Sequence, residues 1–132
     1  MYKIEPQSYG FRLTFGDFIS ASEMREWVND SRKALAIAPK GGFGVFVDMR
    51  TLKPLPQDAR PVMETGQKLY KMSGMTRSVV IVESAMVALQ FRNIAQDTGI
   101  YDWERYISAP DNPMWEQMGL DWITNGIDPD EK

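Results

Sequence analysis

The chain of 132 residues contains neither cysteine nor histidine, and these two absences exclude a wide range of chemistry. Without cysteine there can be no disulfide, no thiolate nucleophile and no zinc site built on thiolates. Without histidine the chain lacks the commonest general base and the commonest metal ligand of proteins. We therefore expect no metal, no cofactor and no catalytic residues. An enzyme that relies on aspartate, arginine, tyrosine and lysine alone is the alternative that we place last. Its candidates for paired acid–base carboxylates are Asp97, Asp102 and Glu104, which we interpret as solvated residues of a polar turn.

Long apolar runs are also missing. The longest strongly apolar run covers residues 79–82, and the first residues contain no apolar segment typical of a signal peptide. We therefore expect no membrane span and a cytoplasmic protein. The lysine and arginine residues are scattered and do not form a stripe interleaved with aromatic residues, so we expect no binding of nucleic acid.

The residues that are present describe one globular domain. A chain with 43% hydrophobic and 25% charged residues is ordinary for a soluble domain, and its length suits a single core. We expect this domain to cover residues 1–127. The remaining residues, 128–132, are expected to form a disordered acidic tail.

Two short apolar runs, at residues 43–47 and 79–82, organise the rest of the chain. They lie within Gly-Phe-Gly-Val-Phe-Val-Asp over residues 42–48 and Arg-Ser-Val-Val-Ile-Val over residues 77–82. A strand that is apolar throughout, without alternation, is buried on both faces, which is typical of central strands in a parallel sheet covered by helices. We expect residues 43–47 and 79–82 to lie side by side in the middle of such a sheet.

Three further strands are expected, at residues 2–4, 9–15 and 103–108, the last at an edge. In the second of these Phe11, Leu13 and Phe15 alternate with polar residues, which predicts a half-exposed strand paired with the first through a turn at residues 6–8. The predicted order is β-β-α-β-α-β-α-β-α. This is an α/β fold with a mixed, mainly parallel β-sheet and helices packed on it.

Four helices are expected, near residues 20–38, 57–74, 84–99 and 111–126. Ser20 with Glu23 three residues later matches a capping box. Asp58, Ser84 and Asp111 are expected to cap the second, third and fourth helices. Gly66 is unfavourable inside the second helix by about 1 kcal/mol relative to alanine. We interpret it as a point of close approach between this helix and the sheet.

A family resemblance is carried by four stretches. They are Leu-Thr-Phe-Gly-Asp-Phe-Ile-Ser from residue 13, Val-Phe-Val-Asp-Met-Arg from residue 45, Arg-Ser-Val-Val-Ile-Val from residue 77, and Tyr-Ile-Ser from residue 106 before the last helix. Together with the element order they resemble the anti-sigma-factor-antagonist (STAS) fold, and more closely its bacterial SpoIIAA-like relatives of unknown function. The resemblance implies a small regulatory or protein-interaction module without catalytic machinery.

The chain departs from that family at its regulatory position. Classical members are regulated by phosphorylation of a serine or threonine at the start of the helix that follows the central strand. Here Gln57 and Asp58 occupy that place, and Thr51 is the only hydroxyl residue in the preceding loop, several residues too early. The phosphorylation switch is therefore not expected in this chain.

Charged residues flank the turn after the central strand. Asp48, Arg50, Asp58 and Arg60 could form a rim that binds a protein partner or an anion at a helix N-terminus. The plainer interpretation, which we favour, is a strand-end residue, a helix cap and solvated loop charges.

Aromatic residues gather in the last third of the chain. They are Tyr101, Trp103, Tyr106, Trp115 and Trp122. Tyrosine and tryptophan are common anchors of interfaces, so these residues could form a dimer surface or a lid over an apolar pocket. The interpretation that we favour is that the last helix covers one face of the sheet.

Two functional hypotheses remain. The first is a regulatory or protein-interaction domain, a homodimer with a possible further protein partner, that uses its strand-end loops and its aromatic C-terminal segment as contact surface. The second is a carrier of a small apolar ligand or lipid, held between the last helices and the sheet. Its motivation is the content of nine methionines and many aromatic residues.

Overall fold

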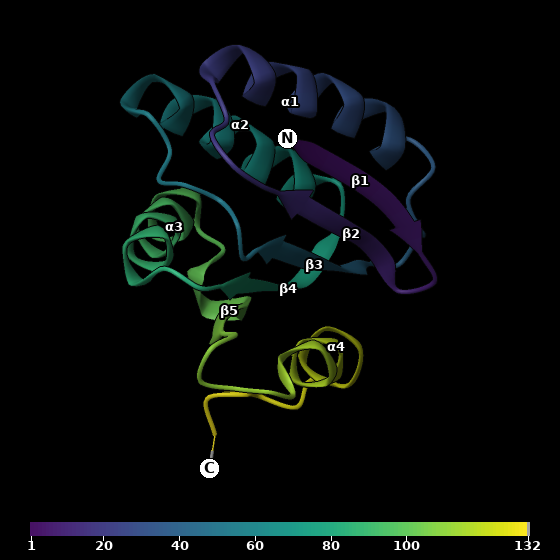
Figure 1. The fold of residues 1–132 in the computed structure, drawn as a ribbon. Coiled ribbons are helices and arrows are strands. Elements are labelled where there is room, and N and C mark those ends of the chain that lie inside the picture. The colour runs from purple at the N-terminus through teal and green to yellow at the C-terminus, as the bar shows by residue number, and fades with distance from the viewer. Residues whose placement is uncertain (132) are drawn as a thin grey trace.

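The computed structural model describes residues 1–131, in which five strands form one sheet in the order β1-β2-β3-β4-β5. The strands are β1 (Tyr2–Gln7), β2 (Gly10–Phe15), β3 (Phe43–Met49), β4 (Met75–Val82) and β5 (Glu104–Ser108). β1 pairs antiparallel with β2, and the other neighbours are parallel. The predicted mixed, mainly parallel sheet is confirmed, as is the order of the elements (Figure 1).

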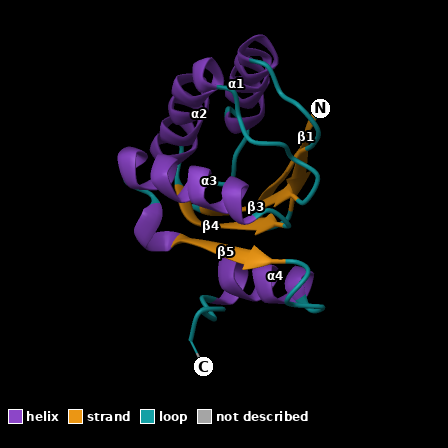
Figure 2. Ribbon diagram, turned by 60° about the vertical axis from the view of Figure 1, so that its left-hand side comes forward, coloured by secondary structure: helices purple, strands orange, loops and turns teal. Residues whose placement is uncertain are grey.

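The helices form layers on both faces of this sheet. α1 (Ala21–Leu35), α2 (Arg60–Met72) and α3 (Ala85–Thr98) cover one face, and α4 (Trp115–Asn125) covers the other. Figure 2 shows α4 alone beneath the strands, with the other three helices above them. Two short 3-10 helices, η1 (Gln57–Ala59) and η2 (Tyr101–Trp103), precede α2 and β5.

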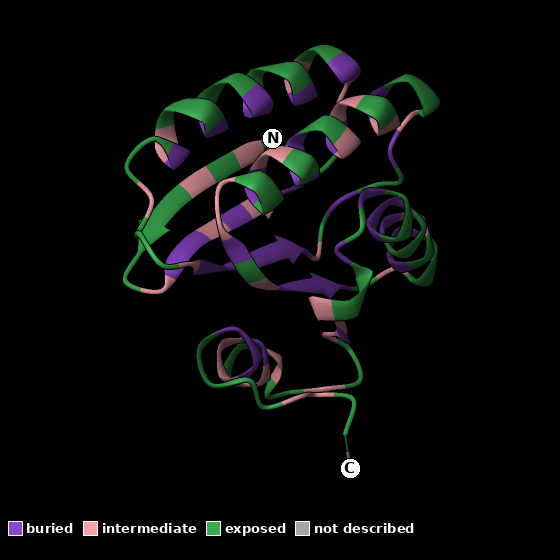
Figure 3. Cartoon of the chain, turned by 180° about the vertical axis from the view of Figure 1, so that it is seen from behind, coloured by how far each residue is buried: buried purple, intermediate pink, exposed green. Residues whose placement is uncertain are grey.

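The central strands β3 and β4 are buried from both sides. Every residue of β3 is buried, and its side chains alternate between two apolar clusters. Val45 and Val47 point into the cluster under α1, α2 and α3, whereas Phe46 joins Val79 and Ile81 in the cluster under α4. The prediction that the two apolar runs lie side by side is confirmed, and Figure 3 shows these strands as buried.

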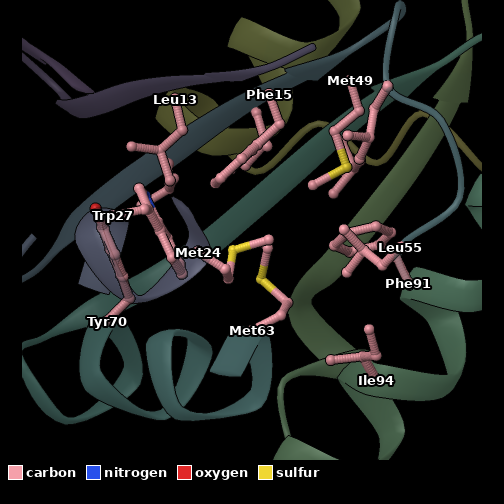
Figure 4. Packing of buried hydrophobic residues seen from close by; sticks show 14 of the residues in the cluster. Leu13, Phe15, Met24, Trp27, Met49, Leu55, Met63, Tyr70, Phe91 and Ile94 are labelled. Carbon is pink, nitrogen blue, oxygen red and sulfur yellow. The ribbon is translucent and has the colours of Figure 1, made fainter. Parts of the chain in front are cut away.

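The larger cluster is organised by aromatic rings that join α1 to α2. Trp27 of α1 stacks on Tyr70 of α2 with ring centroids 5.6 Å apart and an angle of 7° between the planes. Phe15 of β2 meets the same tryptophan edge-on at 5.1 Å (Figure 4). The hydroxyl of Tyr70 is hydrogen-bonded to that of Ser31 at 2.8 Å, so this hydroxyl has a partner within the core.

Gly66 lies against this stack, and our interpretation of it was wrong in one respect. A Cβ atom at Gly66 would overlap the six-membered ring of Trp27. The close approach that requires glycine is therefore between α2 and α1, and not between α2 and the sheet. The tryptophan ring fills the space between the two helices and leaves room only for a hydrogen atom.

Two of the four predicted helix caps are confirmed. Ser20 accepts a hydrogen bond from the backbone of Glu23 at 3.1 Å, and Ser84 caps α3 in the same way. Asp58 instead lies inside η1, and α2 begins after it. α4 begins at Trp115 rather than near Asp111, because Pro113 disfavours helical backbone angles at the residue before it.

The end of the described chain contacts the sheet through an ion pair. Asp128, which we assigned to a disordered tail, accepts hydrogen bonds from Arg105 of β5 at 2.9 Å and 3.0 Å. Both side chains are less than one-fifth exposed, so this ion pair holds residue 128 against the sheet. The last residue of the predicted tail, 132, lies outside the described residues.

The contact at Gly66 predicts an unusual result for a glycine-to-alanine change. In a helix this change ordinarily stabilises a protein by about 1 kcal/mol. We expect Gly66→Ala to lower the free energy of unfolding by about 1–3 kcal/mol, because the ring of Trp27 must move out of its packed position. Urea denaturation measures the effect.

Two further variants make this result specific. Lys68→Ala, on the exposed side of α2, should stay within about 0.5 kcal/mol of the parent protein. In Trp27→Phe the overlapping ring is smaller, so adding Gly66→Ala should cost less there than in the parent. Equal costs in the two backgrounds would show that the tryptophan is not what requires glycine.

Candidate functional site

The four parallel strands β2 to β5 end at one edge of the sheet, which we call the carboxyl edge. In sheets of this kind ligands and partners bind at that edge. Two of its loops are joined by backbone hydrogen bonds of 3.0 Å, from Asp17 to Thr51 and from Lys53 to Asp17. Asp17 adopts a positive φ of 58° at this junction. The loops after β2 and β3 are therefore held as one unit.

Asp48 and Arg50 form a tight ion pair where β3 ends. The Nε and Nη2 atoms of Arg50 donate to the two carboxylate oxygens of Asp48 at 3.0 Å and 2.9 Å, and the backbone N–H of Arg50 donates to the same carboxylate at 3.1 Å. Burial alone would raise the pKa of Asp48, but these bonds outweigh it and hold that pKa below its usual value. The carboxylate is thus ionised and committed to Arg50.

Arg50 also connects the carboxyl edge to α4. Its guanidinium lies over the ring of Trp115, 4.3 Å from the centroid. Trp115 neighbours Phe46 at 6.3 Å, and Arg12 of β2 lies over the ring of Phe46 at 4.6 Å. We call Arg12, Phe46, Trp115 and Arg50 the cation–aromatic row. It fixes the first turn of α4 to β2 and β3.

The first of the two predicted sets, the charged rim, is only partly assembled. The structure brings Asp48 and Arg50 together, but Arg60 instead bonds Glu64 at 3.3 Å and Asp97 of α3 at 2.7 Å. The bond to Asp97 joins α2 to α3, whereas Glu64 lies within α2. Asp58 is exposed on η1. The four residues therefore belong to different contacts.

The predicted aromatic set is divided between the two faces of the sheet. Trp122 of α4 is buried against the sheet, where its N–H donates to the backbone oxygen of Ser78 at 2.9 Å. Trp115 belongs to the same layer. Tyr106 faces α3, and Trp103 contacts both clusters, while Tyr101 is 41% exposed. The interpretation that the last helix covers one sheet face is confirmed.

Glu104 is a residue that we had wrongly interpreted as solvated. It is only 4% exposed and accepts hydrogen bonds from the hydroxyls of Ser78 at 2.6 Å and Tyr106 at 2.5 Å. Burial raises the pKa of Glu104 to about 7, although these two hydrogen bonds oppose the shift. The available signal was the alternation along β5, which places Glu104 and Tyr106 on one face of the strand.

Glu104 borders a small cavity in the larger cluster. The cavity has a volume of about 40 Å³ and is lined mainly by apolar side chains, with Gln67, Ser78 and Glu104 as polar members. An apolar cavity that binds benzene measures about 150 Å³. This space accommodates water and lies under α1, α2 and α3, not between α4 and the sheet.

The fold and the site define a small α/β domain with a five-stranded mixed sheet and an ordered carboxyl edge. Comparison of the chain with models of known families, with curated proteins and with solved structures found no match. Over residues 1–131, no helix has the length and apolar character needed to cross a bilayer. Within the same residues, acidic side chains form no cluster of three or more suited to a metal ion.

The position of Glu104 predicts how stability depends on pH. Its folded pKa of about 7 lies above the ordinary value of 4.5. Below the ordinary value the carboxyl is protonated in both states, and its contribution to stability is fully present. Between about pH 4.5 and about pH 7 the unfolded chain loses this proton while the folded chain keeps it, so the free energy of unfolding should fall by about 3 kcal/mol over that range and stay level above it.

Urea denaturation from about pH 4.5 to about pH 8 measures this fall against two variants. In Glu104→Gln the corresponding loss of stability should disappear, because an amide does not titrate. Asp102→Asn, which changes an exposed carboxyl nearby, should keep the pH dependence of the parent. A Glu104→Gln protein with the parent's pH profile would contradict the assignment.

Proposed function

We propose that this protein is a non-enzymatic regulatory or protein-interaction domain of the SpoIIAA-like type. In this proposal it binds a protein partner through the loops at the carboxyl edge of its sheet. We infer a cytoplasmic setting from the sequence. The proposal rests on one observation, which is the exposure of large apolar side chains on these loops.

Two of the four loops carry such a side chain, and the first turn of α3 carries another after a third loop. Phe18 follows β2 and is 57% exposed, Met86 follows β4 and is 67% exposed, and Met114 follows β5 and is 64% exposed. Leu89, one helical turn after Met86, is 58% exposed. Large apolar groups that stay in water at one edge of a domain are typical of a contact surface, and methionine adapts well to the shape of a partner.

The ordered frame around these side chains supports the same proposal. The Asp17 junction joins the loops that follow β2 and β3, and Arg50 on Trp115 fixes the start of α4. Loops held in one conformation lose little conformational entropy when they bind, so they favour affinity. Arg50, whose side chain is 38% exposed, offers hydrogen-bond donors beside the apolar groups.

A carrier of a small apolar ligand or lipid is the second candidate, motivated by the methionine and aromatic content. The cavity of about 40 Å³ gives it little support, because a lipid would need the core to open. Native mass spectrometry of protein purified from its own cells distinguishes the two candidates. A co-purifying ligand favours the carrier, and a bare chain mass favours the interaction domain.

Site-specific photo-crosslinking in the source cells tests the interaction proposal. A photoreactive phenylalanine analogue placed at Phe18 or Met86 should give discrete products that contain this chain and another protein. The same analogue at Lys68, on the exposed side of α2, should not give those products. Products that are equally abundant from all three positions would contradict a contact surface at the carboxyl edge.

A triple variant tests whether the apolar groups themselves matter. Phe18→Ser, Met86→Ser and Met114→Ser replace exposed side chains, so each should change the free energy of unfolding by about 0.5 kcal/mol or less. With the crosslinker moved to Leu89, the combined variant should lose the products seen in the parent background. Their retention would show that these three side chains do not contribute to binding.

A further inference from the structure

The outer side of β1 is an unpaired strand edge. Within the described residues β1 has a neighbour on one side only, because it stands first in the strand order (Figure 1). The strand is anchored at its start by hydrogen bonds of 2.9 Å in both directions between Met1 and Gly16, and by the hydroxyl of Tyr2, which donates to Asp30 of α1. An ordered edge of this kind is a template for pairing with another strand.

The backbone groups that face outward follow from the register. In an antiparallel pair, opposed residues alternate between those that exchange hydrogen bonds and those that do not. Met1 and Gly16 exchange both bonds, so Lys3 and Glu5 also bond to β2. Tyr2, Ile4 and Pro6 therefore direct their backbone groups away from the sheet. Pro6 fits this arrangement because it has no N–H to donate to β2.

The outward strand is complementary to itself. If two copies of β1 run antiparallel about a two-fold axis at Ile4, the N–H and C=O groups of the two Ile4 residues bond each other. The N–H of Tyr2 then donates to the C=O of Pro6 in the other copy. This bond does not require the N–H that proline lacks. Lys3 lies opposite Glu5 of the other copy, and the two-fold axis produces this pair twice. The pair exchanges no backbone hydrogen bonds, and in such pairs the opposed side chains lie closer together. Both charged side chains are exposed in the single chain.

We propose that β1 pairs antiparallel with β1 of a second copy of this chain, centred on Ile4, to form a symmetric dimer with one continuous ten-stranded sheet, two sheets of five. Charge complementarity favours a second copy of this chain in this register. A register shifted by two residues would place like charges opposite each other. The dimer leaves the carboxyl edge free and does not depend on the proposed partner binding.

Charge reversal tests the register directly. Light scattering after size exclusion, with any tag at the C-terminus, should show a dimer for the parent at micromolar concentrations. Lys3→Glu and Glu5→Lys each create two pairs of like charge and should raise the dissociation constant roughly ten-fold or more. The double variant restores opposite charges and should dimerise like the parent. A mixture of the two single variants should form mixed dimers, because two acidic side chains of one copy then meet two basic side chains of the other.

Two controls separate this arrangement from other dimers. Lys68→Glu makes the same change of charge as Lys3→Glu on the exposed side of α2, and it should leave the dimer unchanged. Hydrogen exchange should protect the amide of Ile4 in the dimer and leave it unprotected in the folded Lys3→Glu monomer. A parent that stays monomeric, single variants that dimerise like the parent, or an Ile4 amide that exchanges freely in the dimer would each overturn the proposal.

Discussion

The burial of β3 and β4 on both faces is the constraint on which the rest of the structure depends. Phe46, Val79 and Ile81 point to the side opposite α1, α2 and α3, and α4 covers them. The contact between α4 and the sheet is close because each of the two contributes a glycine to it. A Cβ atom at Gly119 of α4 would lie 2.6 Å from Phe46, and one at Gly44 of β3 would lie 2.9 Å from Ile123. Side chains at these positions would push helix and sheet apart.

The same packing positions the candidate site. Because α4 lies flat on β3 and β4, its first turn brings Trp115 under Arg50, whose guanidinium is also bound to Asp48. On the other side of the row Arg12 binds Glu116 of α4 at 3.0 Å. The loops of the carboxyl edge are thus anchored to the most deeply buried part of the molecule. Their exposed apolar side chains are presented by an ordered frame.

Much of the fold could be predicted because its causes are local in the sequence. Uninterrupted apolar runs indicated two-sided burial, alternation in β2 indicated a half-exposed strand, and Ser20 and Ser84 stand just before their helices. The site could not be predicted in the same way, because its partners are distant. Arg12 and Glu116 are separated by 104 positions, and no spacing rule connects them. Glu104 was misinterpreted because a carboxylate is ordinarily solvated, and its partner Ser78 becomes visible only when β5 is aligned with β4.

Native-state hydrogen exchange measures most directly whether the doubly covered central strands hold the domain together. The account predicts that the amides of Phe46, Val79 and Ile81 exchange only through global unfolding, with opening free energies equal to the value from urea denaturation. Amides in β1 should open at lower cost. Central amides that exchange more readily than those of β1 would contradict the account, since α4 would then be a loosely attached segment rather than the cover of the sheet.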